Sequence, residues 1–379
     1  MKIGILCYPT YGGSGIVATE LGMSLAKKSY EVHFISSNLP ARLDITNPNI
    51  LFHKVNVQSY PLFQYEPYDI ALSSMIYRVV NFYNLDLLHA HYAIPYAYAA
   101  FTAKQMLKEE GKDLPLVTTL HGTDITLVGQ HPSYKHAVEF SINQSNSITS
   151  VSESLKKDTL QFFNIKKEIQ VITNFIDNSE FNENTACQRL QFAQPDEKIL
   201  IHVSNLRPVK RVQNVLQIFK NVQSKIKSKL LIIGEGPDTE IINQFLEEHP
   251  ELISKVRLLG KISELYSILQ ISDVFLLPSE QESFGLAALE AMAASTPVIS
   301  SDTGGISEVN IHGETGFLAK IGDVETMSHF AVTLLSDENL LKQMKINAKK
   351  QALKFDLQNI LPEYEKMYQK TIEDFRGEF

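Results

Sequence analysis

Short apolar runs alternate with stretches of helical periodicity through the first half of the chain. Strands of this kind, separated by helices, are typical of a parallel sheet that is covered by helices on both faces. The first half is therefore predicted to form one α/β domain. Its expected strands are 2–7, 31–36, 50–57, 87–90, 116–120 and 147–151.

The second half repeats this alternation after a polar segment, 178–194, which we interpret as a linker. At 379 residues the chain is long enough for two domains. The expected strands of the second domain begin at Lys198 and continue with 230–233, 256–259, 273–277 and 296–300. The last helix has one apolar stripe, which is expected to be buried against a partner surface. The stripe consists of Ile360, Tyr364, Met367, Tyr368 and Thr371.

The amino-acid composition excludes several classes of protein. A hydrophobic content of 44% with 21% charged residues is typical of a folded globular chain, and a net charge of −8 argues against a general nucleic-acid binder. Cys7 and Cys187 lie far apart, so neither a disulfide framework nor a metal site is indicated, and no cofactor is expected. Without a signal-peptide pattern or an apolar run of about 18 residues, the sequence predicts a cytoplasmic protein with no stable membrane insertion. The sequence is also compatible with a homodimer.

A glycine loop, 11–21, joins the first predicted strand to a helix. Glycines there allow a ligand to approach the backbone, and a helix N-terminus favours an anion. Gly13, Ser14 and Gly15 also fit the start of a dinucleotide-binding fingerprint. However, no acidic residue follows the second strand at Ser36 to hold a ribose. We therefore interpret the loop as facing a sugar phosphate and an acceptor in a cleft between the domains.

The stretch 278–294 joins a buried strand to an alanine-rich helix through a glycine turn at Gly285. The free N–H groups and positive dipole end of such a helix suit a phosphate. Glu282 and Glu290 flank the helix start and lie about 12 Å apart at helical rise. Because carboxylates repel a phosphate, they are expected to accept hydrogen bonds from the sugar rings on either side of it. This arrangement suggests a nucleotide sugar.

The pair Glu282 and Glu290, within the segment ESFGLAALEAMA, resembles the signature of the retaining glycosyltransferases of family 4. The resemblance implies the GT-B fold, in which two Rossmann-like domains face each other across a cleft and a C-terminal helix crosses back to the first domain. The implied parts are an acceptor domain over 1–170, a nucleotide-sugar donor domain over 171–355 and a crossover helix over 356–379.

Segments 12–22, 91–95 and 119–129 resemble one subfamily of family 4, and this resemblance runs through nearly the whole chain. The subfamily transfers N-acetylglucosamine from UDP-N-acetylglucosamine (UDP-GlcNAc) to the hydroxyl of L-malate, the first step of bacillithiol biosynthesis, with retention and without a metal. UDP-GlcNAc and L-malate are thus the implied substrates. A small dicarboxylate needs converging hydroxyls, backbone N–H groups and a cation. The expected acceptor residues are Ser14, Tyr92, Thr123 and Arg207.

The second half supplies most of the expected donor site. Where family 4 commonly has Gly-Arg-Leu-x-x-x-Lys-Gly, this chain has Asn205 and Lys210 at the charged positions, with Arg207 as a substitute cation. The expected catalytic residues are Lys210 for the leaving diphosphate, Glu282 as a sugar ligand and not a nucleophile, and His121 as a sugar hydrogen-bond partner and not a general base. The expected donor-binding residues are Gly13, Ser14, Gly15, Asn205, Arg207, Lys210, Gly234, Gly260, Glu282, Ser283, Phe284, Gly285, Leu286 and Glu290.

The sequence leaves three alternatives open. Another family 4 enzyme, with a different UDP- or GDP-sugar and a lipid, inositol or polysaccharide acceptor, would share the donor motif. A nicotinamide dehydrogenase would need an acidic residue after the second strand. A sugar-nucleotide sensor would bind the donor without turning it over. His89 and His91 also make zinc conceivable, but without a convincing third ligand we favour structural roles for them.

Overall fold

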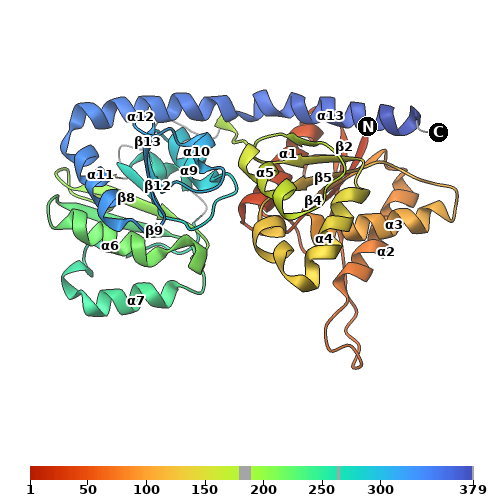
Figure 1. Ribbon diagram of the computed structural model, residues 1–379, viewed down its shortest axis with the longest axis horizontal. Coiled ribbons are helices and arrows are strands. Elements are labelled where there is room, and N and C mark those ends of the chain that lie inside the picture. Colours follow the sequence, from red (N-terminus) through yellow and green to blue (C-terminus); the bar gives the residue numbers. More distant parts are fainter. Residues whose placement is uncertain (179–188, 263–264, 378–379) are drawn as a thin grey trace. The chain divides into compact units, whose positions relative to one another are not determined.

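The computed structural model describes residues 1–178, 189–262 and 265–377 of the chain. The chain divides into two compact units. The first unit comprises Met1–Asn174 and Gln358–Phe379, and the second comprises Phe175–Leu357. The last helix of the chain therefore belongs to the same unit as the first strand (Figure 1).

The first unit is built on a seven-stranded parallel sheet in the order β3-β2-β1-β4-β5-β6-β7. Its central strands β4 and β5 are buried at every residue, as expected for strands covered on both faces. The strands are β1 (Lys2–Leu6), β2 (Glu31–Ser36), β3 (Ile50–Lys54), β4 (Leu87–His91), β5 (Leu116–Leu120), β6 (Ser147–Ser150) and β7 (Ile169–Val171). The α-helices are α1 (Gly13–Lys27), α2 (Tyr68–Tyr83), α3 (Tyr98–Lys108), α4 (Pro132–Gln144), α5 (Glu153–Phe162) and α13 (Leu357–Gly377).

The second unit is built on a six-stranded parallel sheet in the order β10-β9-β8-β11-β12-β13. Helices α6, α7, α11 and α12 contribute apolar faces to its core. The strands are β8 (Lys198–Val203), β9 (Ser228–Ile233), β10 (Val256–Leu258), β11 (Val274–Leu277), β12 (Val298–Ser301) and β13 (Gly316–Ala319). The α-helices are α6 (Val212–Gln223), α7 (Thr239–Glu248), α8 (Leu265–Gln270), α9 (Leu286–Ala293), α10 (Ile306–Val309), α11 (Val324–Ser336) and α12 (Glu338–Ala352).

The two sheets share one connectivity. In each, the first strand of the unit lies between the second and the fourth, so that β1 separates β2 from β4 and β8 separates β9 from β11. The strand order reverses at β1 and at β8, and ligands of doubly wound sheets bind outside the carboxyl ends of the strands at such a reversal. The predicted α/β class with two Rossmann-like parts is confirmed.

Helix α13 buries the apolar stripe that its sequence predicts. Tyr364 and Tyr368 are fully buried, and the Tyr368 hydroxyl lies 2.7 Å from His89 Nδ1. The Thr371 hydroxyl lies 2.7 Å from that of Ser147 on β6. The helix thus completes the core of the first unit.

Several strand bounds differ from the sequence expectation by one to three residues, and two of these differences affect the arrangement of the first unit. The strand expected over 50–57 ends at Lys54, because its partner β2 ends at Ser36, the residue that pairs with Lys54. Strand β4 runs one residue beyond the expected end, to His91, which pairs with Thr119 of β5. The second difference places both His89 and His91 inside the sheet.

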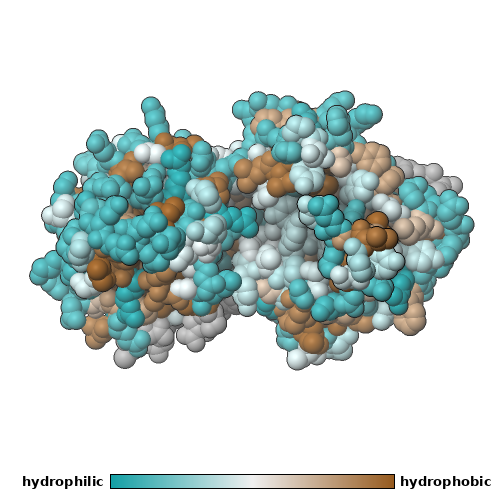
Figure 2. All heavy atoms as spheres, turned by 90° about the horizontal axis from the view of Figure 1, so that it is seen from below, coloured by the Kyte–Doolittle hydropathy of each residue, from teal (hydrophilic) through white to brown (hydrophobic). Residues whose placement is uncertain are grey.

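The surface is mixed in character. The face in Figure 2 is mostly hydrophilic, with separate hydrophobic patches. The segment between β3 and α2 exposes large apolar side chains, with Leu62 83% and Tyr65 82% accessible. None of the helices in the described parts of the chain combines the length and the apolar character that crossing a membrane requires.

Candidate active site

The predicted residues gather in two clusters, one in each unit. In the second unit, one loop (204–211) follows β8 and another (278–285) follows its neighbour β11. The amide of Glu280 donates to the carbonyl of Val209 over 2.8 Å, which joins the two loops. Residues distant in sequence therefore lie together at the carboxyl edge of this sheet, where α/β proteins bind ligands.

Lys210 and Glu282 form an ion pair across these loops. Lys210 Nζ lies 2.6 Å from Glu282 Oε1, and only 21% and 11% of the two side chains are exposed. Beside them, Arg211 Nε lies 3.6 Å from a carboxylate oxygen of Glu280. The cation expected to meet a diphosphate is thus present, and in this structure it is held by the carboxylate expected to bind a sugar.

Gly285 forms the turn that starts α9. Its φ is +91°, and a Cβ at this position would overlap the side chain of Ile306, so the turn requires glycine. The N-cap residue Gly285 has no side chain with which to cap α9, whose first N–H groups are therefore suited to an anion. The amide of Gly305 donates to the carbonyl of Glu282 over 2.9 Å, which holds the loop from its other side.

The remaining predicted donor residues of the second unit surround these loops. Asn205 and Arg207 are exposed, so the amide of one and the guanidinium of the other are accessible to a ligand. Gly234 has a φ of +120° and donates its amide to the carbonyl of Gly260 over 2.8 Å. A Cβ on Gly234 would overlap the carbonyl of Ser204, so this glycine packs β9 against the first loop. The others are half-buried or buried within or beside α9: Ser283, Phe284, Leu286 and Glu290.

His202, at the end of β8, was not among the predicted site residues. Its Nδ1 lies 2.8 Å from the Leu276 carbonyl and must donate to it, so Nε2 accepts from the Ser204 hydroxyl, also at 2.8 Å. Burial lowers the pKa of His202 to about 4, so the ring is neutral. Nearby Lys210 lowers this pKa further, whereas Glu282 raises it. The only sequence signal is a histidine inside an apolar strand that leads into the cationic loop.

In the first unit, the predicted glycine loop starts α1. Gly13 and Ser14 occupy the first turn, with Gly13 exposed and Ser14 half-buried. A Cβ on Gly15 would overlap the carbonyl oxygens of Tyr8 and Thr10, so this glycine allows the helix start to approach the end of β1. Gly13, Ser14 and Gly15 therefore lie in a different unit from the other predicted donor residues.

His121 and Tyr92 lie together at the ends of β4 and β5, and Thr123 follows two residues after His121. His121 Nε2 lies 2.9 Å from His91 Nδ1, and the ring of His121 lies 5.2 Å from that of Tyr92. Burial lowers the pKa of His121 to about 3, so its imidazole is neutral and suited to hydrogen bonding. Tyr92 has a φ of +99°, a conformation that bulky residues seldom adopt outside functional sites. Thr123 is half-buried.

His89 and Cys7 serve the fold. His89 Nδ1 lies 2.7 Å from the Tyr368 hydroxyl and Nε2 lies 2.7 Å from that of Thr119, which agrees with a structural role. Burial raises the pKa of the Cys7 thiol to about 12. Cys187 lies outside the described residues. Within the described ranges, His, Cys, Asp and Glu form no group of three or more that could hold a metal ion.

Two further residues of the first unit were not predicted. Tyr8, 37% exposed after β1, packs edge-on against Tyr92, with ring centroids 5.2 Å apart. Asp124 is buried and accepts hydrogen bonds from the amides of Ala93, His121 and Gly122. The signal for Asp124 is an aspartate two residues after a glycine, a position that favours a side-chain bond to the turn backbone.

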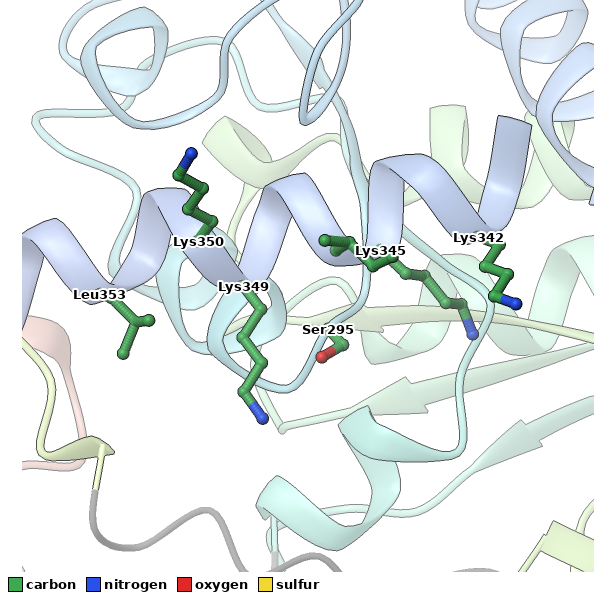
Figure 3. Close-up of a pocket in the computed structure, with 7 residues that line it drawn as sticks. Ser295, Lys342, Lys345, Lys349, Lys350 and Leu353 are labelled. Carbon is green, nitrogen blue, oxygen red and sulfur yellow. The ribbon is translucent and has the colours of Figure 1, made fainter. Parts of the chain in front are cut away.

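A groove along α12 contains none of the predicted site residues (Figure 3). One lysine in it, Lys345, donates to Asp273 over 3.3 Å, and Asp273 also pairs with Arg189 at 2.8 Å. This lysine is therefore engaged in holding the second unit together. The groove is lined by Ser295, Lys342, Lys345, Ile346, Lys349, Lys350 and Leu353.

Comparison with known proteins places both halves in sugar-transferring families. Residues 11–180 match the model of Glycosyltransferase Family 4, and residues 188–351 match that of Glycosyl transferases group 1. The chain is 45% identical over 377 residues to the N-acetyl-alpha-D-glucosaminyl L-malate synthase of Bacillus anthracis, which covers 99% of this chain and 98% of that protein.

Solved structures share the fold at low identity. Sucrose-phosphate synthase from Thermosynechococcus elongatus superimposes with a TM-score of 0.83 at 17% identity, covering 99% of this chain and 100% of that one. Anabaena HepE in complex with UDP and glucose gives 0.81 at 19% identity, over 98% and 100% of the two chains. Together with the matches in sequence, these likenesses show that the chain belongs to the family 4 glycosyltransferases and has their GT-B fold.

Proposed function

We propose that this protein transfers N-acetylglucosamine from UDP-GlcNAc to the hydroxyl of L-malate, with retention and without a metal ion. The observation that carries the proposal is the 45% identity with the malate synthase over 99% of the chain, because it includes the first unit as well as the second. Donor motifs recur among sugar transferases, whereas the acceptor half differs between subfamilies. The proposal includes a cytoplasmic reaction that begins bacillithiol biosynthesis.

On the donor side, a diphosphate needs a cation and N–H donors. Lys210 and the first turn of α9 provide both at the joined loops of the second unit. In the proposal the diphosphate replaces Glu282 as the partner of Lys210, and Glu282 then accepts hydrogen bonds from sugar hydroxyls. Glu290 serves the ribose, and the exposed Arg207 contributes a second cation.

On the acceptor side, malate offers two carboxylates and one hydroxyl. The first turn of α1 supplies backbone N–H groups and the Ser14 hydroxyl. Tyr92 and Thr123 supply two further hydroxyls from the ends of β4 and β5. In the proposal Arg207 of the second unit provides the charge that a dicarboxylate requires.

The reaction proceeds on the face of the sugar that UDP leaves. The malate hydroxyl oxygen forms a bond to the anomeric carbon while the bond from that carbon to the diphosphate oxygen breaks, and the departing oxygen takes the hydroxyl proton. Lys210 and the amides of Gly285 and Leu286 stabilise the negative charge of the leaving group, which is usually the largest catalytic contribution. Because Lys210 supplies positive charge at the diphosphate, no metal is needed. Neutral His121 hydrogen-bonds the sugar.

The test is the release of UDP from UDP-GlcNAc with and without L-malate, in the presence of EDTA. We expect release that depends on malate, and a product whose anomeric proton coupling identifies an α linkage. Release only with another acceptor, or none despite tight UDP binding, would reject the malate assignment. Loss of activity in EDTA, restored by a divalent cation, would reject metal independence.

A further inference from the structure

Two turns with unusual backbone conformations lie side by side in the first unit. Tyr92, after β4, has a φ of +99°, and Gly122, after β5, has a φ of +113°. The two strands are paired, and the amide of Tyr92 donates to the carbonyl of Thr119 over 2.9 Å. A strained conformation in a residue such as Tyr92 persists only where its surroundings enforce it.

The carboxylate of Asp124 contacts both turns. Its Oδ2 accepts from the amide of Ala93, directly after Tyr92, at 2.9 Å. Its Oδ1 accepts from the amides of Gly122 at 3.1 Å and His121 at 3.3 Å. Hydrogen bonds to an ionised acceptor are about twice as strong as neutral ones. The side chain is 2% exposed, so water does not compete for these amides.

We infer that Asp124 is the positioning residue of the acceptor site, which holds Tyr92 and Thr123 in place through the backbone amides beside them. The inference rests on the proposed function, because that function assigns the two hydroxyls to malate. Asp124 acts on the acceptor only through these residues. A misplacement of about 1 Å in a positioned group can lower a rate about 100-fold.

Burial disfavours the ionised form of Asp124, and a carboxylate retained in such a place supports the same role. Burial raises the pKa of Asp124 to about 6, although the amides of Ala93, Gly122 and His121 act in the opposite direction. The neighbouring Tyr8 hydroxyl is uncharged, because burial, Tyr92 and Asp124 raise its pKa to about 12. Within the described parts of the chain, backbone amides of the two turns, and no cation, act to lower the pKa of Asp124.

The kinetic test compares Asp124→Asn with Asp113→Asn. Asparagine has the same shape but is neutral and has only one acceptor oxygen, so one of the two turns loses its partner and the other keeps a weaker, uncharged one. Asp113 is a suitable control because it is a mostly buried carboxylate of the same unit, paired with Lys104 at 3.5 Å and Lys108 at 3.2 Å.

For Asp124→Asn we expect kcat/KM for malate to fall about 10- to 100-fold while KM for UDP-GlcNAc changes by less than about twofold. Asp113→Asn should change neither constant. An Asp124→Asn enzyme with wild-type kcat/KM for malate would overturn the inference, as would an equal rise of KM for both substrates.

Amide hydrogen exchange separates this inference from the proposed function. If the wild-type protein releases no UDP with malate, the proposed function fails, but exchange can still be measured. We expect Asp124→Asn to exchange faster in both 91–97 and 120–127, and Asp113→Asn to match the wild type there. Unchanged exchange in either segment, or an equal increase throughout the first unit, would overturn the positioning role.

Discussion

Lys210 Nζ and Glu282 Oε1 lie 2.6 Å apart although 72 positions separate the two residues in the sequence. Each sits in a loop that follows a central strand of the second sheet, and the pair is mostly buried. The ion pair gives Lys210 one fixed position instead of many rotamers, which favours catalysis by a preorganised charge. In the proposed function a diphosphate takes the place of Glu282 beside Lys210, and donor binding would then be coupled to the release of Glu282 toward the sugar.

Replacement of this lysine tests its role directly. We expect Lys210→Ala to lower kcat for UDP release by about 10²- to 10³-fold, because the leaving diphosphate loses a preorganised charge. Lys227→Ala is the control, since Lys227 forms an exposed pair with Asp196 at 2.8 Å, and such pairs contribute little. Wild-type kcat in both variants would show that Lys210 does not stabilise the diphosphate.

Gly285→Ala is expected to reduce both stability and donor affinity. A left-handed conformation costs a residue with a Cβ about 1–2 kcal/mol, and this Cβ would also overlap Ile306. Gly111→Ala provides the matched control, because its φ is +72° but its Cβ would meet no atom within 4 Å. Urea unfolding should show the larger loss for Gly285→Ala. Calorimetry should show about tenfold weaker UDP binding for this variant alone, the effect of losing one hydrogen bond to a charged group. Equal UDP affinity in the two variants would contradict the assigned phosphate site.

Tyr368→Phe is expected to destabilise the first unit by about 1–3 kcal/mol, because it leaves Nδ1 of buried His89 without its hydroxyl partner. Urea unfolding followed by circular dichroism measures this change. Tyr134 is 47% exposed, so Tyr134→Phe should stay within about 0.5 kcal/mol of the wild type. A Tyr368→Phe protein as stable as the control would show that the hydrogen bond contributes nothing.

Acid is expected to destabilise the fold through buried histidines. Burial lowers the pKa of His89 and His121 to about 3 and that of His202 to about 4, from an ordinary value of 6.5. Below pH 6.5 the unfolded chain therefore binds protons that the folded chain does not, and stability falls by up to about 1.4 kcal/mol per pH unit for each group. Asp124 has the opposite effect because its pKa is raised to about 6, but burial also lowers the pKa of His33, His53 and His91.

The measurement is the urea midpoint between about pH 7.5 and pH 5.5, a range in which the unfolded histidines become charged. The midpoint should fall as the pH falls, and less steeply in His202→Gln. A midpoint that does not change over this range would contradict the lowered histidine pKa values.

The strands and their ligand-binding ends follow from local sequence patterns. Apolar runs of four to seven residues predicted most strands, and the spacing of Tyr364 and Tyr368 predicted the buried face of α13. The turn at Gly285 was also predictable, because few arrangements other than a left-handed residue explain a glycine between a strand and an alanine-rich helix. Hydrophobic periodicity and turn-forming residues depend on neighbours that are close in the sequence, so both can be recognised from the sequence alone.

Contacts between distant segments were not predictable in this way. The bond between Lys210 and Glu282 depends on the pairing of β8 with β11, and the sequence alone gives no register for that pair. The bond from Asp124 to Ala93 depends in the same manner on the pairing of β4 with β5. The positive φ of Tyr92 has no local signal at all, since tyrosine is not a residue that favours this conformation.

Helix α13 makes the first unit discontinuous in sequence. The chain leaves this unit at Asn174 and returns to it at Gln358, after the whole second unit. During synthesis from the N-terminus, the strands of the first sheet emerge long before the helix that supplies Tyr364 and Tyr368 to their core. The first unit therefore cannot complete its folding until α13 has been translated, and a ribosome that stops before α13 releases a first unit with an open apolar face.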